Sequence, residues 1–280
     1  VLGMMAGGIF IVMAVNAFRL GSDADSSRRD SGTGGFSLIG ESSLPIYEDL
    51  NSKAGLDAFG LDEEILSKAS IVPFRVREGD DASCLNLNRA QNPVLVGVNA
   101  GMLAEKKAFR FVGKGSWDQL KSSPSTESLS VPAIADQATA MWGLGKGVGD
   151  YLDYTDGKGK PVKVRIVALL AGSILQGKMI IDERAFLEKF PDAAGYKFLL
   201  IDSPSDKTPE LSSHLTRQLE ARGLALESTR ARLAEFNSVQ NTYIGIFTVL
   251  GGFGVLLGTA GLGVLLARHV MERQGELGLM

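Results

Sequence analysis

The chain has 280 residues, with 29 lysines and arginines against 32 aspartates and glutamates, and its net charge is -3. Because it lacks the basic balance that binding to nucleic acid requires, we expect no nucleic-acid partner. The single cysteine, Cys84, has no internal partner for a disulfide and therefore says little about the compartment. The length allows one large domain or two small ones in addition to membrane segments.

Residues 1–19 are predicted to form a transmembrane helix that lacks its first residues. The run 1–18 carries no charge, and about 20 apolar residues are needed to cross a bilayer. A secretory signal peptide is the alternative, but no basic leader precedes the run and no small-residue cleavage site follows it. Because the chain begins at Val1 and ends within a charged segment, we expect a fragment of a longer polypeptide.

Residues 20–35 predict a flexible linker, because they are polar and rich in glycine and have no apolar periodicity. This linker can flex or fold back along the surface. Residues 36–228 then predict an α+β domain with two lobes. The elements expected in the first lobe are strands at 36–40, 71–77 and 94–98, a helix at 62–69 that is capped by Asp62, and a helix at 100–109. Pro73 inside its strand favours an edge or a bulge.

The second lobe is predicted from clearer turn signals. Asp156 and Gly157 separate two alternating runs, which is typical of a β-hairpin with strands at 151–155 and 161–170. The other expected elements are helices at 117–120, 137–142, 183–190 and 208–222 and strands at 131–135, 179–182 and 195–202. Pro209 in the first turn and Gly223 at the end mark the bounds of the last helix.

Residues 229–241 predict a stalk helix, and residues 242–267 predict a second transmembrane helix. No charged residue occurs from 236 to 267, which is long enough for a hydrocarbon core of about 30 Å. The stalk residues that we single out are Leu233, Phe236, Val239 and Gln240. Glycines four positions apart let membrane helices approach closely, and this spacing predicts helix packing at Gly3 and Gly7 and at Gly254 and Gly258.

Residues 268–280 predict a truncated cytoplasmic segment. Arg268, His269 and Arg273 follow the second span directly, which favours the cytoplasm for the tail. Arg28 and Arg29, with Arg19, flank the first span on its other side and argue against this orientation. Large domains cross the membrane largely regardless of charge, so we expect residues 20–235 to be periplasmic or extracytoplasmic.

The sequence offers little catalytic chemistry. Neither His214 nor His269 has the context of a nucleophilic triad, and Cys84 has no neighbouring zinc ligands, so we expect no catalytic residue and no metal site. The glycine-rich segments 113–116 and 145–147 lack the spacing of a phosphate loop, and turns are the better interpretation. Asp150, Asp153 and Asp156 lack the order of a calcium loop, and we expect solvated turn carboxylates there.

The order of span, large domain, span and charged tail resembles the FtsX/MacB-type (type VII) ABC transporter permeases. The most specific parts are the two spans and the tail, where residues 272–279 read Glu-Arg-Gln-Gly-Glu-Leu-Gly-Leu and resemble a Glu-Arg-x-x-Glu-Ile-Gly-type segment. Weaker resemblances to MacB-like periplasmic domains lie at residues 131–136, 143–150 and 162–170, and at 173–177 followed by 186–191. Residues 36–110 match no part of the family.

The resemblance implies a non-catalytic permease subunit in the bacterial inner membrane that exports or extracts an envelope substrate such as a lipid, lipoprotein, peptide or drug-like compound. It implies an ABC ATPase partner, separate or fused, that binds ATP and Mg, so the chain itself has no cofactor. A homodimer or heterodimer of permeases, contact with membrane lipid and a periplasmic partner protein are also implied. The residues at the ATPase contact would be Glu272, Arg273, Glu276, Leu277 and Gly278.

Two other classes of function stay open. One is a membrane-tethered sensor or regulator whose periplasmic domain binds and activates an envelope partner such as a murein hydrolase. The other is a membrane-anchored enzyme, which would lose activity on substitution of His214, Cys84 or a paired carboxylate. The simpler interpretation of the tail is that Arg268 and Arg273 only anchor a helix at the lipid headgroups.

Overall fold

The structure is a computed structural model of the whole chain, and it describes residues 27–80, 82–83, 92–121 and 130–272. Within the first 26 residues it describes Gly3, Ala6, Gly7, Ile9, Phe10 and Met13, all of them helical. Contacts divide the chain into two compact units. One is Asp23–Phe236, and the other joins Val1–Ser22 with Asn237–Met280.

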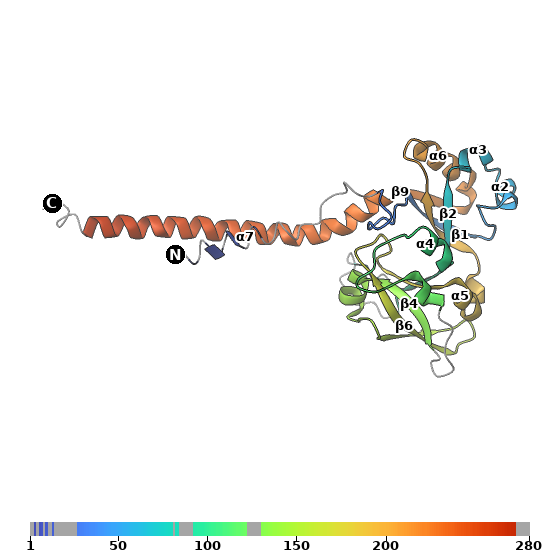
Figure 1. Ribbon diagram of the computed structural model, residues 1–280, viewed down its shortest axis with the longest axis horizontal. Helices are drawn as coiled ribbons and strands as arrows, with labels where there is room; N and C mark the ends of the chain where they lie inside the picture. The colour runs from blue at the N-terminus through green and yellow to red at the C-terminus, as the bar shows by residue number, and fades with distance from the viewer. Residues whose placement is uncertain are drawn as a thin grey trace. The chain divides into compact units, whose positions relative to one another are not determined.

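The unit Asp23–Phe236 contains nine strands and a set of short helices, which confirms the predicted α+β class. The strands are β1 (Leu38–Ile46), β2 (Ser70–Arg77), β3 (Val94–Val98), β4 (Ser130–Asp136), β5 (Tyr151–Thr155), β6 (Pro161–Leu170), β7 (Lys178–Asp182), β8 (Tyr196–Asp202) and β9 (Leu224–Ser228). The helices are α2 (Lys53–Phe59), α3 (Glu63–Leu66), α4 (Ala100–Glu105), η1 (Trp117–Lys121), η2 (Thr139–Leu144), α5 (Glu183–Lys189), η3 (Pro191–Ala193), α6 (Thr208–Gln218) and η4 (Glu220–Arg222). The helix α7 (Thr229–Glu272) begins directly after β9 (Figure 1).

All nine strands belong to one mixed sheet with the order β5-β6-β4-β7-β3-β2-β8-β1-β9. The pairs β3 with β7 and β4 with β6 are parallel, and the other neighbours are antiparallel. β1 lies between β8 and β9, so the start of the domain pairs with its end.

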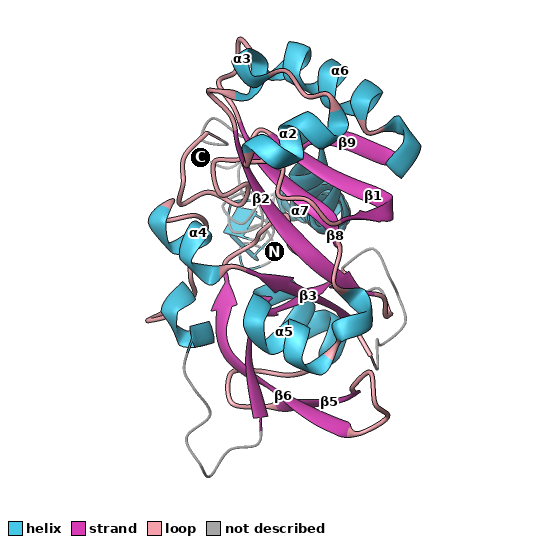
Figure 2. Ribbon diagram, turned by 90° about the vertical axis from the view of Figure 1, so that its right-hand side faces the viewer, coloured by secondary structure: helices cyan, strands magenta, loops and turns pink. Residues whose placement is uncertain are grey.

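The buried apolar residues of the domain form three clusters, and their positions explain the two predicted lobes. One cluster extends along one face of the sheet and includes residues of α4, η1 and the first turns of α7. The other two are separate: α5 contributes Phe186 to one, and α6 contributes Leu211 and Leu215 to the other. Figure 2 shows α6 with α2 and α3 at the end of the sheet that holds β1 and β9, and α5 over β3. The lobes are therefore two ends of one continuous sheet, each with its own helices.

Local sequence signals predict several elements correctly. The hairpin of β5 and β6 has the predicted bounds, and Asp156 accepts hydrogen bonds from the amides of Lys158 and Lys160 in its turn. Asp62 caps α3 by accepting from the amide of Glu64. Pro73 lies in an interior strand, but pairing between β2 and β3 begins only at Phe74, so the missing N–H of Pro73 costs no bond to β3.

Other elements differ from the prediction. The helix expected at 137–142 is the π-helix η2, whose end is set by Gly145 at φ 65° and by a bond from the Lys146 amide to the Ala140 carbonyl. Gly143 in η2 touches the Ala82 carbonyl, an approach that a Cβ would block. The helix expected at 208–222 ends at Gln218. The elements α2 and β9 carry no strong periodic signal and were not predicted.

The helix α7 is 44 residues long. Among the described residues, its segment Gly245–Glu272 is the one helix that is long and apolar enough to cross a membrane, judged by length and composition. Its 28 residues would extend about 42 Å, more than the roughly 30 Å of a hydrocarbon core. Most residues of the first predicted span lie outside the described residues, so that span stays a prediction.

A close contact under α5 gives a first testable prediction. A Cβ on Gly97 of β3 would lie 2.5 Å from Cβ and Cγ of the buried Phe186. We expect Gly97→Ala to lower the free energy of unfolding by about 1–2 kcal/mol, because the packed core must shift to admit the methyl group. Urea unfolding of the full chain in detergent measures this, with Gly147→Ala as the control because a Cβ there would come no closer than 4.0 Å to its nearest neighbour, Asp150 Oδ2. Equal stability of the two variants would contradict the packing argument.

Candidate functional site

Two distant parts of the chain meet where α7 begins. Thr229 is buried, its hydroxyl donates to the Phe36 carbonyl at 2.6 Å, and its amide donates to the Ser37 carbonyl at 3.2 Å. Phe36 and Ser37 directly precede β1, so these bonds join the entry into the domain to its exit. The β1 and β9 pair leads to the same place, since Leu38 lies opposite Ser228.

The first turns of α7 pack into the domain core. Leu233 and Phe236 are buried, and Leu233 belongs to the cluster that extends along one face of the sheet. Gly32 lies against Leu233, since a Cβ on Gly32 would lie 2.9 Å and 3.0 Å from its two methyl carbons. The same Cβ would touch the Gly172 carbonyl, and the Gly32 carbonyl accepts a bond from the Ile174 amide at 2.9 Å. We call Gly32, Thr229, Leu233 and the loop 171–177 the junction.

The second half of the predicted linker is fixed to the domain. Arg29 donates to Asp202 at 2.7 Å, and Lys106 donates to the same oxygen at 2.9 Å. Burial would raise the pKa of Asp202, but the hydrogen bonds from Lys106 and Arg29 outweigh it and hold the pKa below its usual range. The Arg29 carbonyl accepts from the amide of Phe109, which has a positive φ of 68°. Residues 27–35 thus fold back along the domain.

The loop 171–177 connects the junction to η2 through a buried carboxylate. Asp136, at the end of β4, accepts from the amide of Ser173 at 2.5 Å, from its hydroxyl at 2.8 Å and from the Ala138 amide at 2.8 Å. The Thr139 hydroxyl in η2 accepts from the Gly177 amide at 2.8 Å. Burial raises the pKa of Asp136 to about 6, although the bonds from Ser173 oppose this.

Charged residues surround the start of α7. Arg232 lies 3.2 Å from a carboxylate oxygen of Glu227 in β9 and 3.7 Å from one of Glu235, one turn further along the helix. These pairs are partly exposed, so each contributes little to stability. They link β9 to α7 across the point where the chain passes from strand to helix.

The predicted site residues fall into four groups. Leu233 and Phe236 lie in the domain core, as described above. Glu272 ends α7 and pairs with Arg268 at 2.7 Å. Of the helix-packing glycines, Gly258 is buried, whereas an added Cβ at Gly3, Gly7 or Gly254 would have no atom of the described residues within 4 Å. The last group lies outside what the structure describes. It consists of the side chains of Val239 and Gln240 and the residues Arg273, Glu276, Leu277 and Gly278. Their roles stay predictions.

The structure explains several residues that were weighed for chemistry. His214 accepts a hydrogen bond from the Asp62 amide at 3.0 Å, which is a structural role on α6. Asp150 accepts from the Gly147 amide within a turn. Among the described residues no group of three His, Cys, Asp or Glu side chains could hold a metal ion. Cys84 lies outside the described residues.

Sequence reasoning singled out Leu233 as a stalk residue but missed Gly32, against which it packs, and the buried Asp136. Gly32 stands in a glycine-rich stretch typical of a linker, so no local signal marks its packing against Leu233. Asp136 had a local signal, since an aspartate between an apolar strand and a helix is a common cap. Its partner Ser173 is far away in sequence, and the pair appears only in the fold.

The chain was compared with known proteins. No family model matches it, and no curated protein matches it significantly in sequence. Solved structures do match. The extracellular domain of the noncanonical ABC-type transporter YknZ from Gram-positive bacteria is 13% identical, with a TM-score of 0.33 over 68% of this chain and 98% of that one. The periplasmic region of MacB from Actinobacillus actinomycetemcomitans is 10% identical, with a TM-score of 0.37 over 79% of this chain and 96% of that one.

The buried hydroxyl of Thr229 gives a second prediction. Thr229→Val keeps the shape of the side chain and leaves the Phe36 carbonyl without this donor. We expect the free energy of unfolding to fall by about 1–2 kcal/mol, the cost of an unsatisfied buried acceptor. Urea unfolding measures it, with Thr155→Val on the exposed side of β5 as the control. The argument fails if both variants lose the same amount.

Proposed function

We propose that this chain is a permease subunit of an FtsX/MacB-type ABC transporter in the bacterial inner membrane, with residues 20–235 on the extracytoplasmic side. The observation that carries the proposal is the continuity of α7. One helix includes Thr229 and Leu233, which pack in the domain, and the apolar segment Gly245–Glu272. Secondary-structure elements can carry coupling between two sites, so α7 is suited to couple a membrane event to the domain.

The charged tail supports the same proposal. Residues 272–279 resemble the segment that contacts the ATPase in FtsX/MacB-type permeases, and the sequence shows no phosphate loop. In this proposal the partner ATPase binds ATP and Mg, and Glu272, Arg273, Glu276, Leu277 and Gly278 contact it. The permease acts as a homodimer or heterodimer on an envelope substrate such as a lipid, lipoprotein, peptide or drug-like compound.

The junction could pass a movement of α7 on to the rest of the domain. A shift of Leu233 along the α7 axis would press on Gly32, which is bonded to the loop 171–177. That loop is bonded in turn to Asp136 and Thr139. Movement of α7 would therefore reach η2 through the buried, packed contacts of Leu233, Asp136 and Thr139.

Purification of the full-length protein from its native membrane tests the proposal. We expect an ATPase subunit, fused or separate, to be recovered with it after mild cross-linking. Recovery with a murein hydrolase and without any ATPase would instead support the membrane-tethered regulator.

The tail gives a third prediction. Alanine at Glu272, Arg273 and Glu276 together should reduce substrate-stimulated ATP hydrolysis about fivefold or more, because the contact that couples the two sites is lost. Membrane insertion should be unchanged. Alanine at Glu210 and Arg217 on α6 is the matched control, since it removes charges of both signs far from the tail in sequence. Unchanged coupling in the triple variant would remove these residues from the mechanism.

A further inference from the structure

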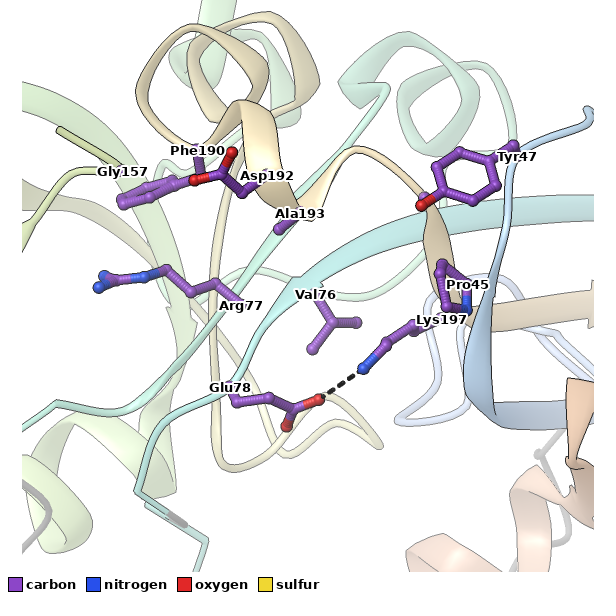
Figure 3. Close-up of a pocket in the computed structure, with 11 residues that line it drawn as sticks. Pro45, Tyr47, Val76, Arg77, Glu78, Gly157, Phe190, Asp192, Ala193 and Lys197 are labelled. Atoms are coloured by element: carbon purple, nitrogen blue, oxygen red, sulfur yellow. Dashed lines mark hydrogen bonds and ion pairs between the residues drawn. The ribbon is translucent and has the colours of Figure 1, made fainter.

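A cleft of about 320 Å³ opens on the domain between the ends of β1, β2 and β8, the helix η3 and the turn of the β5 and β6 hairpin. Its volume is in the range of small-molecule sites. Figure 3 shows Val76, Phe190, Ala193 and Pro45 around it, with Arg77 reaching toward Phe190. The cleft therefore combines apolar walls with a small number of charged groups.

Arg77 is the distinctive group in this cleft. Its guanidinium carbon lies 4.5 Å from the centroid of the Phe190 ring and 5.9 Å from that of Tyr154. Both rings are buried, so they hold the guanidinium in place. Among the residues that the structure describes, no carboxylate pairs with Arg77 and no oxygen accepts a hydrogen bond from it.

Arg75, two positions earlier on the same strand, is a useful comparison because its guanidinium has hydrogen-bond acceptors. It donates to Glu183 at 2.9 Å and to the Tyr196 hydroxyl at 3.1 Å, and it stacks on the Tyr196 ring. Arg77 has the stacking without the acceptors. Its five N–H donors remain available to a ligand in the cleft.

The other charges in the cleft do not neutralise Arg77. Lys197 pairs with Glu78 at 3.2 Å, and Figure 3 shows this pair apart from the Arg77 guanidinium. Asp192 is exposed at the rim near Gly157, where water screens its repulsion of an anion. The Arg77 guanidinium is therefore a cation that is held in place beside the apolar walls of the cleft.

We propose that this cleft binds a small amphiphile with one anionic headgroup, a carboxylate or a phosphate ester. Arg77 holds the headgroup by charge-assisted hydrogen bonds, and the apolar body lies on Val76 and Phe190. This inference rests on the cleft alone and does not need the permease proposal.

Binding to the full chain in lipid nanodiscs tests the proposal, with empty nanodiscs as the blank. The probes are octanoate, octyl phosphate, octanamide and inorganic phosphate, followed by saturation-transfer NMR. We expect octanoate or octyl phosphate to bind about tenfold or more tightly than octanamide, and inorganic phosphate alone to bind weakly. The tighter of the two anionic probes identifies the headgroup. Octanamide binding as tightly as both anions would overturn the proposal.

Matched variants locate the binding. Arg77→Gln should weaken the anionic probe about tenfold or more, while Arg165→Gln, at an exposed position of β6, should leave it unchanged. Asp192→Asn should strengthen binding, because it removes an exposed negative charge at the rim. Ala193→Met fills the cleft and keeps Arg77, so it tests the site even if the arginine variant does not fold. Full affinity in both Arg77→Gln and Ala193→Met would refute the site.

Discussion

Replacing Gly32 by valine is expected to lower the free energy of unfolding of the domain by about 3 kcal/mol, the largest packing effect that we predict. The added side chain would meet the methyl groups of Leu233 and the backbone of Gly172 at once. Neither neighbour has room to move, since Leu233 is buried in the core and Gly172 belongs to the bonded loop 171–177. Trp117, which is buried, reports the unfolding in urea once the exposed Trp142 is replaced by phenylalanine.

A double-mutant cycle separates this contact from a general disturbance. Leu233→Ala alone should cost about 2–5 kcal/mol, because it leaves a cavity. In the Gly32→Ala background it should cost less, since the cavity admits the new methyl group. Strict additivity of the two substitutions would show that Gly32 and Leu233 do not share a contact. Under the proposed function, loss of this contact should also lower substrate-stimulated ATP hydrolysis by the partner ATPase in the same variants.

The stability of the domain should fall as the pH rises from about 4 to about 6, because of Asp136. Burial raises the pKa of this carboxyl from its ordinary value near 3.8 to about 6 in the folded protein. Below pH 4 the group is neutral in the folded and unfolded states and costs nothing. Between pH 4 and pH 6 it ionises more readily in the unfolded state, so unfolding becomes easier, by on the order of 2–3 kcal/mol in total. Above pH 6 the loss is complete.

Asp136→Asn should remove this slope, whatever it does to the absolute stability. Urea midpoints measured at intervals between pH 3.5 and pH 7 (roughly the window set by the two pKa values) give the comparison. Asp150→Asn is the control, since this turn carboxylate is exposed and should keep the slope. Asp202 acts with the opposite sign and at lower pH, because its pKa lies below the usual range. A slope that survives in Asp136→Asn would assign the pH dependence to another group.

Local signals in the sequence were enough for the fold class and for many of its elements. Alternation predicts the β5 and β6 hairpin, the Asp156 turn closes it, and Asp62 begins α3 as expected. The order of the strands could not be predicted, because it depends on pairings between distant segments such as β1 with β8. The close approach of Gly143 in η2 to the Ala82 carbonyl is likewise a contact between distant segments, and it appears only in the fold.

The candidate site could be predicted only in part, for the same reason. Leu233 and Phe236 were singled out from an amphipathic segment as stalk residues, and the fold buries both in the domain core. Gly32 looks like a linker glycine until the fold brings the loop 171–177 against it. Arg77 looks like any charge at the end of a strand, and only the position of the Phe190 ring shows that it is stacked without an acceptor. Roles that depend on contacts across the chain leave no local pattern.

The Thr229 amide donates a hydrogen bond to the Ser37 carbonyl. The chain therefore enters and leaves the sheet of the domain at one point. A folded unit whose two ends are neighbours can be inserted into a polypeptide, or cut out of it, without separating the segments that it interrupts. A short turn between residues 36 and 229 would replace everything from β1 to β9. The ends of the sheet, at β1 and β9, therefore meet at one place, which is the arrangement that domain insertion requires.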